Sequence, residues 1–257
     1  MTWLERDPQR RSDPTKVLSG CQSIIVVGMN YYTDHVADES KQAGRIARYA
    51  WGKDYHDLMK TRLKQLEDYL HEQIPEIQTR SYVDTGPIME KAWAQEAGIG
   101  WIGKHTNLVS TDYGSWLLLG EILTTSELEA DKPAIDLCES CSLCIQACPT
   151  GAIVEPYQLD AERCISYLTI EYRGSLTDIE PELRKKMGNR IFGCDDCLDI
   201  CPFNINAQPT REPHFQPTPW TLHPQLSQLA SLNEEEFRSM TKGSPTRRPK
   251  YEGFIRN

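Results

Sequence analysis

The sequence predicts an α+β fold in two parts, a layered domain of sheet and helices followed by a smaller, cysteine-rich domain. Two observations support this. Apolar strand-like segments alternate with amphipathic helical segments up to about residue 130, and eight of the nine cysteines follow residue 137. With 257 residues, 39% hydrophobic and 25% charged, the composition is that of a globular protein and excludes disordered, fibrous and coiled-coil classes. We expect domains at residues 1–130 and 131–205, and a C-terminal segment, 206–257, that packs on both.

The segments of the first domain follow one another in a clear order. Residues 23–29 are continuously apolar and rich in β-branched side chains, which is typical of a buried strand covered on both faces. Residues 54–74 carry apolar side chains at helical spacing until Pro75 ends the pattern. A short strand at 80–83 and a helix at 88–97 come next, and residues 116–123 are typical of another buried strand. These elements predict layers of sheet and helix, with a strand order that the pattern leaves open.

The cysteine spacing of the second domain predicts iron–sulfur chemistry. The run from Cys138 to Pro149 has the C-x2-C-x2-C-x3-C-P spacing of bacterial ferredoxins. The run from Cys194 to Pro202 is similar, but Ile191 stands where the leading cysteine belongs, so we expect Cys164 to replace it. In two-cluster ferredoxins the fourth cysteine of each run binds the other cluster. The first 4Fe–4S cluster is thereby assigned Cys138, Cys141, Cys144 and Cys201, and the second Cys148, Cys164, Cys194 and Cys197.

Structural zinc is the alternative for these thiols, although zinc sites usually use two C-x2-C pairs rather than three cysteines within seven residues followed by Cys-Pro. Cys21 is left over and is expected to be a small buried hydrophobe.

Two motifs of the first domain have competing interpretations. Residues 98–103 match G-x-G-x-x-G, but they follow a predicted helix instead of a strand, so a helix stop and a turn are favoured over a dinucleotide site. Asp84 ends a predicted strand immediately before a turn. By position alone it is a turn or cap residue, whereas in a cofactor cleft it is suited to donate a proton.

Charge and hydropathy indicate the compartment and the partners. Residues 1–11 lack the apolar core of a signal peptide, and the longest apolar runs are far shorter than a bilayer span, so we expect a cytoplasmic protein without membrane contact. The net charge of −9 disfavours non-specific nucleic-acid coating. Basic clusters at 10–11, 60–64, 184–186 and 247–250 could still meet phosphate, with a solvated charged surface as the ordinary explanation of each.

Several longer segments resemble a known family, and the likeness covers nearly the whole chain. The segments are Val83-Asp-Thr-Gly-Pro87, Glu90-Lys-Ala-Trp-Ala94, Gly98-Ile-Gly-Trp-Ile-Gly-Lys104, Tyr113-Gly-Ser-Trp116, Leu119-Gly-Glu-Ile122, Gly243-Ser-Pro245 and Arg247-Arg248. Together with the two cysteine runs they resemble the epoxyqueuosine reductases. The resemblance implies a cobalamin-binding domain followed by a ferredoxin-like domain with two 4Fe–4S clusters, and reduction of epoxyqueuosine to queuosine at the wobble position of tRNA.

The resemblance also implies roles for individual residues and for partners. It makes Asp84 the proton donor and a cobalamin contact, and it suggests cobalamin contacts at Arg6, Tyr49, Asn107 and Ser166, for which simple packing is the alternative. We expect a monomer that binds the tRNA anticodon stem-loop and takes electrons from an external low-potential donor. Family members usually extend beyond both ends of this chain.

Two other functions remain open at this point. A corrinoid reductive dehalogenase would share the cofactors, but the N-terminus lacks the apolar segment of a twin-arginine signal. A two-cluster electron carrier would bind no corrinoid.

Overall fold

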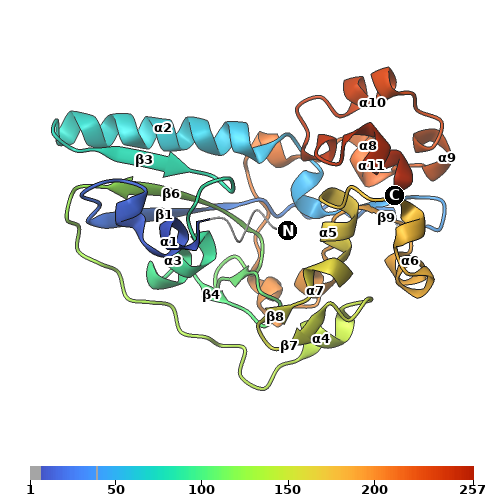
Figure 1. Ribbon diagram of the computed structural model, residues 1–257, viewed down its shortest axis with the longest axis horizontal. Coiled ribbons are helices and arrows are strands. Elements are labelled where there is room, and N and C mark those ends of the chain that lie inside the picture. Colours follow the sequence, from blue (N-terminus) through green and yellow to red (C-terminus); the bar gives the residue numbers. More distant parts are fainter. Residues whose placement is uncertain (1–6, 39) are drawn as a thin grey trace.

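The computed structural model describes residues 7–38 and 40–257, and its first part is built on a three-stranded antiparallel sheet (Figure 1). The strand order is β1 (Ser23–Asn30), β6 (Leu117–Thr124) and β3 (Thr79–Tyr82), so β6 lies in the centre. The three predicted strands are confirmed. The expectation that the first strand is covered on both faces is wrong, because β1 is an edge strand of a small sheet and its residues stay partly or fully exposed.

Two helices cover opposite faces of this sheet (Figure 1). The amphipathic helix α2 (Tyr55–Gln73) packs Met59 and Leu63 against Ile122 of the central strand. On the other face, Trp93 of α3 (Glu90–Glu96) packs near Leu123. Because side chains alternate between the faces of a strand, odd-numbered residues of β6 point toward α3 and even-numbered ones toward α2.

The glycine motif at residues 98–103 belongs to a tight hairpin and not to a nucleotide loop. Gly98 follows α3 with a φ of 74°, a conformation that favours glycine at a helix end. The strands β4 (Trp101–Ile102) and β5 (Leu108–Val109) then pair antiparallel. A Cβ at Gly100 would lie 2.2 Å from the Val109 carbonyl oxygen, so close backbone approach explains this glycine.

The cysteine-rich part consists of short elements beside the sheet, reached by a long outer segment, 125–142 (Figure 1). Its elements are α4 (Leu143–Ala147), β7 (Ile153–Glu155), β8 (Gln158–Leu159), α5 (Ile165–Ile170), α6 (Pro181–Met187), β9 (Arg190–Phe192) and α7 (Asp196–Asp199). Strand β9 pairs in parallel with β2 (Arg45–Ile46) of the first part. The two parts are therefore joined by backbone hydrogen bonds as well as by packing.

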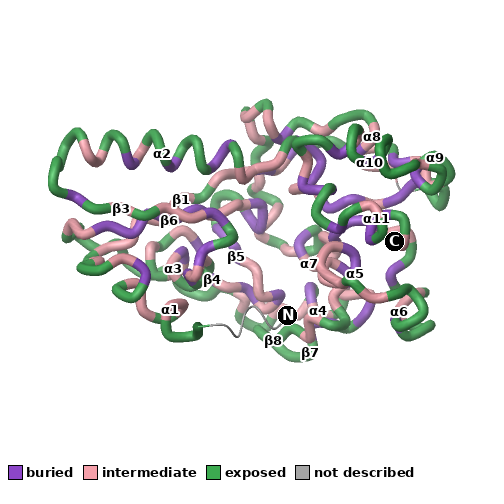
Figure 2. Tube along the Cα trace, turned by 45° about the horizontal axis from the view of Figure 1, so that its top comes forward, coloured by how far each residue is buried: buried purple, intermediate pink, exposed green. Residues whose placement is uncertain are grey.

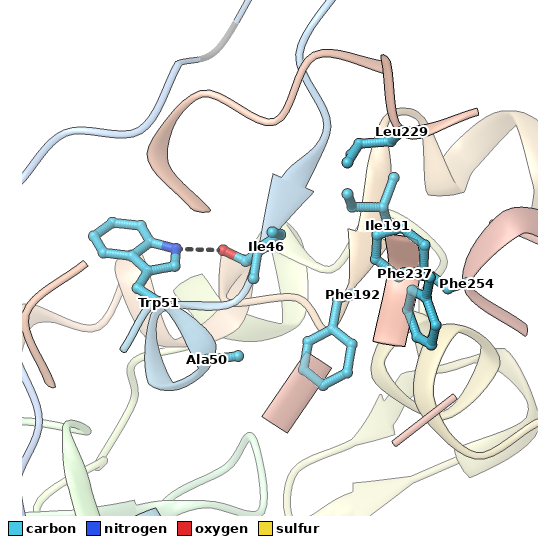
Figure 3. Close-up of a cluster of buried hydrophobic side chains, with 8 residues drawn as sticks. All are labelled: Ile46, Ala50, Trp51, Ile191, Phe192, Leu229, Phe237 and Phe254. Carbon is cyan, nitrogen blue, oxygen red and sulfur yellow. Dashed lines mark hydrogen bonds between the residues drawn. The ribbon is translucent and has the colours of Figure 1, made fainter. Parts of the chain in front are cut away.

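The C-terminal segment closes over both parts. It contains α8 (Pro219–Leu222), α9 (Leu226–Leu229), α10 (Glu234–Met240) and α11 (Lys250–Arg256). Figure 3 shows the shared core: Ile46, Ala50, Trp51, Ile191, Phe192, Leu229, Phe237 and Phe254. Trp51 also donates from Nε1 to the Ile46 carbonyl oxygen at 2.8 Å. Residues from all three predicted segments thus share one core, and Figure 2 shows further buried positions along α2 and around the sheet.

Short elements complete the chain. They are the helix α1 (Pro8–Ser12) and the 3-10 helices Pro14–Lys16, Arg48–Ala50, Ala161–Arg163, Leu176–Asp178, Pro202–Asn206, Pro213–Phe215 and Pro245–Arg247. Among the described residues, no helix is both long enough and apolar enough to cross a bilayer.

Candidate functional site

A cavity of about 280 Å³ lies between the sheet and the cysteine-rich part. It brings together four of the predicted site residues, which come from well-separated segments: Tyr49, Asp84, Asn107 and Ser166. The fifth predicted contact, Arg6, lies outside the described residues. The aliphatic side of the cavity is formed by Leu117, Leu118 and Leu119 of β6. The cavity therefore combines an apolar wall with a small number of polar groups, which is the usual character of a ligand site.

Asp84 lies in the loop after β3, with a backbone φ of 58° that is uncommon for a residue other than glycine. Its Oδ2 lies 3.4 Å from Nε2 of His56. The hydrogen bond with His56 lowers the pKa of Asp84 more than burial raises it. Without substrate, Asp84 is therefore ionised near neutral pH, and the proton that it is predicted to donate has to come from a neighbouring group.

His56 is a suitable source of that proton. It lies in the first turn of α2, where Asp54 is the N-cap residue and accepts from the His56 backbone N–H at 3.0 Å. Nδ1 of the ring lies 2.7 Å from the same Asp54 oxygen, so the imidazole is held between two carboxylates. Hydrogen bonds with Asp54 and then with Asp84 raise the pKa of His56 to about 9. The ring is thus positively charged at neutral pH.

The first turn of α3 adds two more ionisable side chains to the cavity wall. Burial, reinforced by the charge of Asp84, raises the pKa of Glu90 to about 7. Burial lowers the pKa of the neighbouring Lys91, whose ammonium donates to the Thr106 carbonyl oxygen at 2.7 Å. Below Asp84, in the central strand, burial and then the charges of Glu90 and Asp84 raise the pKa of Glu121 to about 9. Asp84 and Glu90 therefore line the cavity, and Glu121 is buried close enough to them for their charges to raise its pKa.

The thiols assigned to the first cluster lie close enough to act on one another electrostatically. Burial is the main cause of the raised pKa of Cys144, and the charges of Cys138, Cys141 and Cys201 raise it further. Trp101 of β4 also donates from Nε1 to the Cys138 sulfur at 3.4 Å. The helix α4 and the end of the second cysteine run thus come together, as the crossed assignment requires.

The other four thiols line a second cavity of about 210 Å³: Cys148, Cys164, Cys194 and Cys197. Burial raises the pKa of Cys197, and the charges of Cys194, Cys164 and Cys148 add to this effect. Cys164 is the N-cap residue of α5 and lies opposite the second cysteine run. Cys164 thus lies where it could replace the leading cysteine that is missing at Ile191.

The two cavities share a wall. Four residues line both of them: Lys91, Asn107, Ser166 and Cys194. A group bound in the first cavity would therefore lie next to the second set of thiols. Such a group would be close enough to receive electrons from a cluster held by those thiols. Asp84 and Glu90 line only the first cavity.

The sequence interpretation did not identify several residues of this site. His56 stands in a segment whose pattern predicts only a helix. Glu90, Lys91 and Glu121 stand in segments that carry the family resemblance, which gives them no individual role. Glu121 carried a usable signal, since a lone carboxyl within the apolar run 116–123 is costly to bury unless it has a function. For His56, only its distance from Asp84 in the folded chain reveals the contact.

Comparisons with known proteins agree on one family. Residues 11–85 match the family model "Epoxyqueuosine reductase QueG, DUF1730", and residues 137–204 match "4Fe-4S double cluster binding domain". The chain is 43% identical to the epoxyqueuosine reductase of Synechocystis sp. (strain ATCC 27184 / PCC 6803 / Kazusa), covering 100% of this chain and 88% of that protein. It is 42% identical to that of Escherichia coli (strain K12), covering 100% and 68%.

Solved structures of epoxyqueuosine reductases also resemble this chain. A selenomethionine-labelled epoxyqueuosine reductase superposes with a TM-score of 0.90 at 35% identity, covering 99% of this chain and 68% of that one. An epoxyqueuosine reductase with a tRNA-Tyr epoxyqueuosine-modified stem loop superposes with a TM-score of 0.89 at 35% identity, covering 97% and 66%. A third, from Bacillus subtilis, has its catalytic loop swung out of the active site; its TM-score is 0.88 at 34% identity, covering 97% and 66%.

Proposed function

The chain belongs to the epoxyqueuosine reductase family, and we propose that it reduces epoxyqueuosine to queuosine at the wobble position of tRNA with cobalamin and two 4Fe–4S clusters. The observation that carries this proposal is the shared wall between the Asp84 cavity and the cavity of Cys148, Cys164, Cys194 and Cys197. Asp84, the proposed proton donor, and the four thiols proposed to hold a cluster thus line adjoining cavities. A reductive deoxygenation needs both a proton donor and an electron source.

The donor set fits two cubane clusters. Eight thiols from two crossed cysteine runs gather in two groups of four, and the second group surrounds a cavity of its own. We propose Cys138, Cys141, Cys144 and Cys201 as ligands of the first cluster and Cys148, Cys164, Cys194 and Cys197 as ligands of the second. The match to a double-cluster domain supports iron–sulfur clusters over structural zinc.

The first cavity fits the reactive face of a corrinoid. Its leucine wall on β6 suits a flat macrocycle, and Tyr49, Asn107 and Ser166 offer hydroxyl and amide groups at its edge. When bound, cobalamin would supply a strongly reducing metal centre that accepts electrons one at a time. The chain's residues then position the substrate and supply protons.

Asp84 is the residue proposed to protonate the epoxide oxygen. Conversion of an epoxide to an alkene takes two electrons and two protons, breaks both C–O bonds, forms the C=C bond and releases water. Asp84 Oδ2 faces the charged His56 ring at 3.4 Å, so His56 Nε2 can supply Asp84 with the first proton that it passes to the epoxide. Asp54 keeps the ring oriented through its 2.7 Å contact with Nδ1.

The tRNA and the electron donor are the proposed partners. Arg248 lies close enough to Asp84 to lower its pKa, and its Nε donates to Glu171 at 2.9 Å. One of the predicted basic clusters thus lies near Asp84, and we propose that it meets the phosphates of an anticodon stem-loop. A cytoplasmic monomer reduced by an external low-potential donor is consistent with such a substrate.

Anaerobic reconstitution tests the proposal. We expect about eight irons per chain, uptake of cobalamin, and loss of one oxygen atom from an epoxyqueuosine-containing anticodon stem-loop in the presence of a low-potential reductant. Eight irons without cobalamin uptake or turnover would indicate an electron carrier instead. Zinc in place of iron would overturn the cluster assignment.

A further inference from the structure

Glu121 is a fully buried acid that the mechanism above does not use. It lies in the central strand β6, paired with Val26 of β1 and Tyr82 of β3. Neither of its carboxyl oxygens has a hydrogen-bond partner within residues 7–38 and 40–257. Its odd-numbered position directs the side chain toward α3 and away from the apolar contact with α2.

A purely structural side chain would be unfavourable here. An unpaired polar group in a protein interior costs about 1–3 kcal/mol, and an ionised carboxylate costs far more. An apolar residue at the same position would avoid this cost, as its neighbours Ile122 and Leu123 do. Buried acids with strongly perturbed pKa values are concentrated at functional sites.

Glu90 links Glu121 to the cavity. It is the first residue of α3 and lines the cavity with Asp84, and its Oε1 is buried without a hydrogen-bond partner among the described residues. The backbone of Asp84 forms a hydrogen bond that lowers the pKa of Glu90. Glu90 therefore contacts the Asp84 loop, while its charge acts on Glu121 behind it.

We propose that Glu121 and Glu90 form a buried proton store that recharges Asp84 during turnover. This inference rests on the proposed function, because the reaction needs two protons and Asp84 carries one at a time. The first proton passes from His56 through Asp84 to the epoxide oxygen; the second reaches Asp84 through Glu90 from Glu121, so that the oxygen departs as water. Glu121 acts only through the other two carboxyls, so it is a positioning residue for this proton.

The charges around the pair agree with a stored proton. The groups facing Glu121 are Asp84 in the loop after β3, Tyr82 on β3, and Glu90 and Lys91 at the start of α3. Burial and then the charges of Glu90 and Asp84 together raise the pKa of Glu121 to about 9. Burial also lowers the pKa of Lys91. At neutral pH Glu121 is thus the protonated member of the group.

Steady-state turnover of the epoxyqueuosine stem-loop by the reconstituted enzyme tests the store. In Glu121→Gln, kcat is expected to fall about 10²-fold, the lower range for general acid catalysis, with KM, iron content and cobalamin uptake unchanged. The decline of wild-type kcat at alkaline pH should become shallower in Glu121→Gln, because of these two proton donors only His56 then ionises near pH 9. Glu127→Gln is the matched control, because Glu127 is an exposed acid just beyond β6. Wild-type kcat and an unchanged pH profile in Glu121→Gln would overturn the proposal.

Two further measurements keep the test decisive. If Glu121→Gln does not fold or take up its cofactors, Glu90→Gln tests the proposal instead. Loss of kcat at constant KM in Glu90→Gln supports the proton store, and wild-type kcat overturns it. Infrared spectra of the wild-type protein at pH 7 should contain a neutral-carboxyl band that Glu121→Gln lacks, whether or not the enzyme turns over. Absence of that band overturns the store, whereas a wild-type enzyme that shows the band but does not reduce the stem-loop overturns the proposed function alone.

Discussion

The protonation of Glu121 makes a prediction about folding that is independent of catalysis. Burial raises the pKa of this carboxyl from 4.5 to about 9. The unfolded chain ionises near pH 4.5 while the folded chain keeps its proton, so the stability contributed by the neutral form is complete below pH 4.5 and declines until about pH 9. At about 1.4 kcal/mol per pH unit, the decline between acid and pH 7 is about 3 kcal/mol. Glutamine does not titrate, so Glu121→Gln removes this term.

Urea unfolding under anaerobic conditions measures the effect. The free energies of unfolding of the wild type and of Glu121→Gln are compared at several pH values from 5 to 8, with Glu127→Gln as control. The variant is expected to gain stability relative to the wild type as pH rises, while the control follows the wild type. A difference between Glu121→Gln and the wild type that stays constant over this range would refute the argument, whatever its absolute size.

Three further predictions concern the clusters, the proton donor and the tRNA. Cys164→Ser should lower the iron content from about eight to about four per chain and abolish turnover, whereas Cys21→Ser should keep the iron content and the turnover of the wild type. Iron analysis tests this, and eight irons in Cys164→Ser would remove Cys164 from the ligand set. Because His56 holds the pKa of Asp84 low, His56→Gln should move the Asp84 limb of the pH profile of kcat/KM to higher pH. A limb that does not move would show that His56 does not control the protonation of Asp84. Arg248→Gln should weaken stem-loop binding and reduce its salt slope by about one, and wild-type affinity and slope would exclude a phosphate contact.

Much of the fold follows from local patterns. The helix α2 extends over nearly the predicted range because its apolar side chains recur along one face and Asp54 caps its start. The strand β6 is central, which accounts for its almost unbroken apolar run. The apolar run of β1 resembles that of β6, although β1 is an edge strand. Composition does not tell an edge strand from a central one, because the difference lies in which strands pair.

The candidate site could be predicted only in part. The cysteine spacing determines which thiols form each run, and the crossed rule predicts Cys201 in the first set and Cys164 in the second. In the structure the charge of Cys201 acts on Cys144 and that of Cys164 on Cys197, and the two ligand sets stay a prediction. The position of Asp84 after a strand predicts a turn or cap residue, and its role as proton donor comes from the family resemblance. His56 lies 28 residues from Asp84 in sequence, and their contact arises only when α2 packs on the sheet beside the β3 loop. Interactions of this kind depend on tertiary packing and leave no local pattern.

The central claim is that this chain deoxygenates epoxyqueuosine in tRNA with Asp84 as the proton donor. The most direct measurement compares wild type and Asp84→Asn, both reconstituted with iron–sulfur clusters and cobalamin, on an epoxyqueuosine-containing stem-loop, with the product followed by mass spectrometry. The account predicts queuosine from the wild type, and from Asp84→Asn equal iron and cobalamin content with turnover at least about 10²-fold lower. Equal turnover by the two proteins would contradict it.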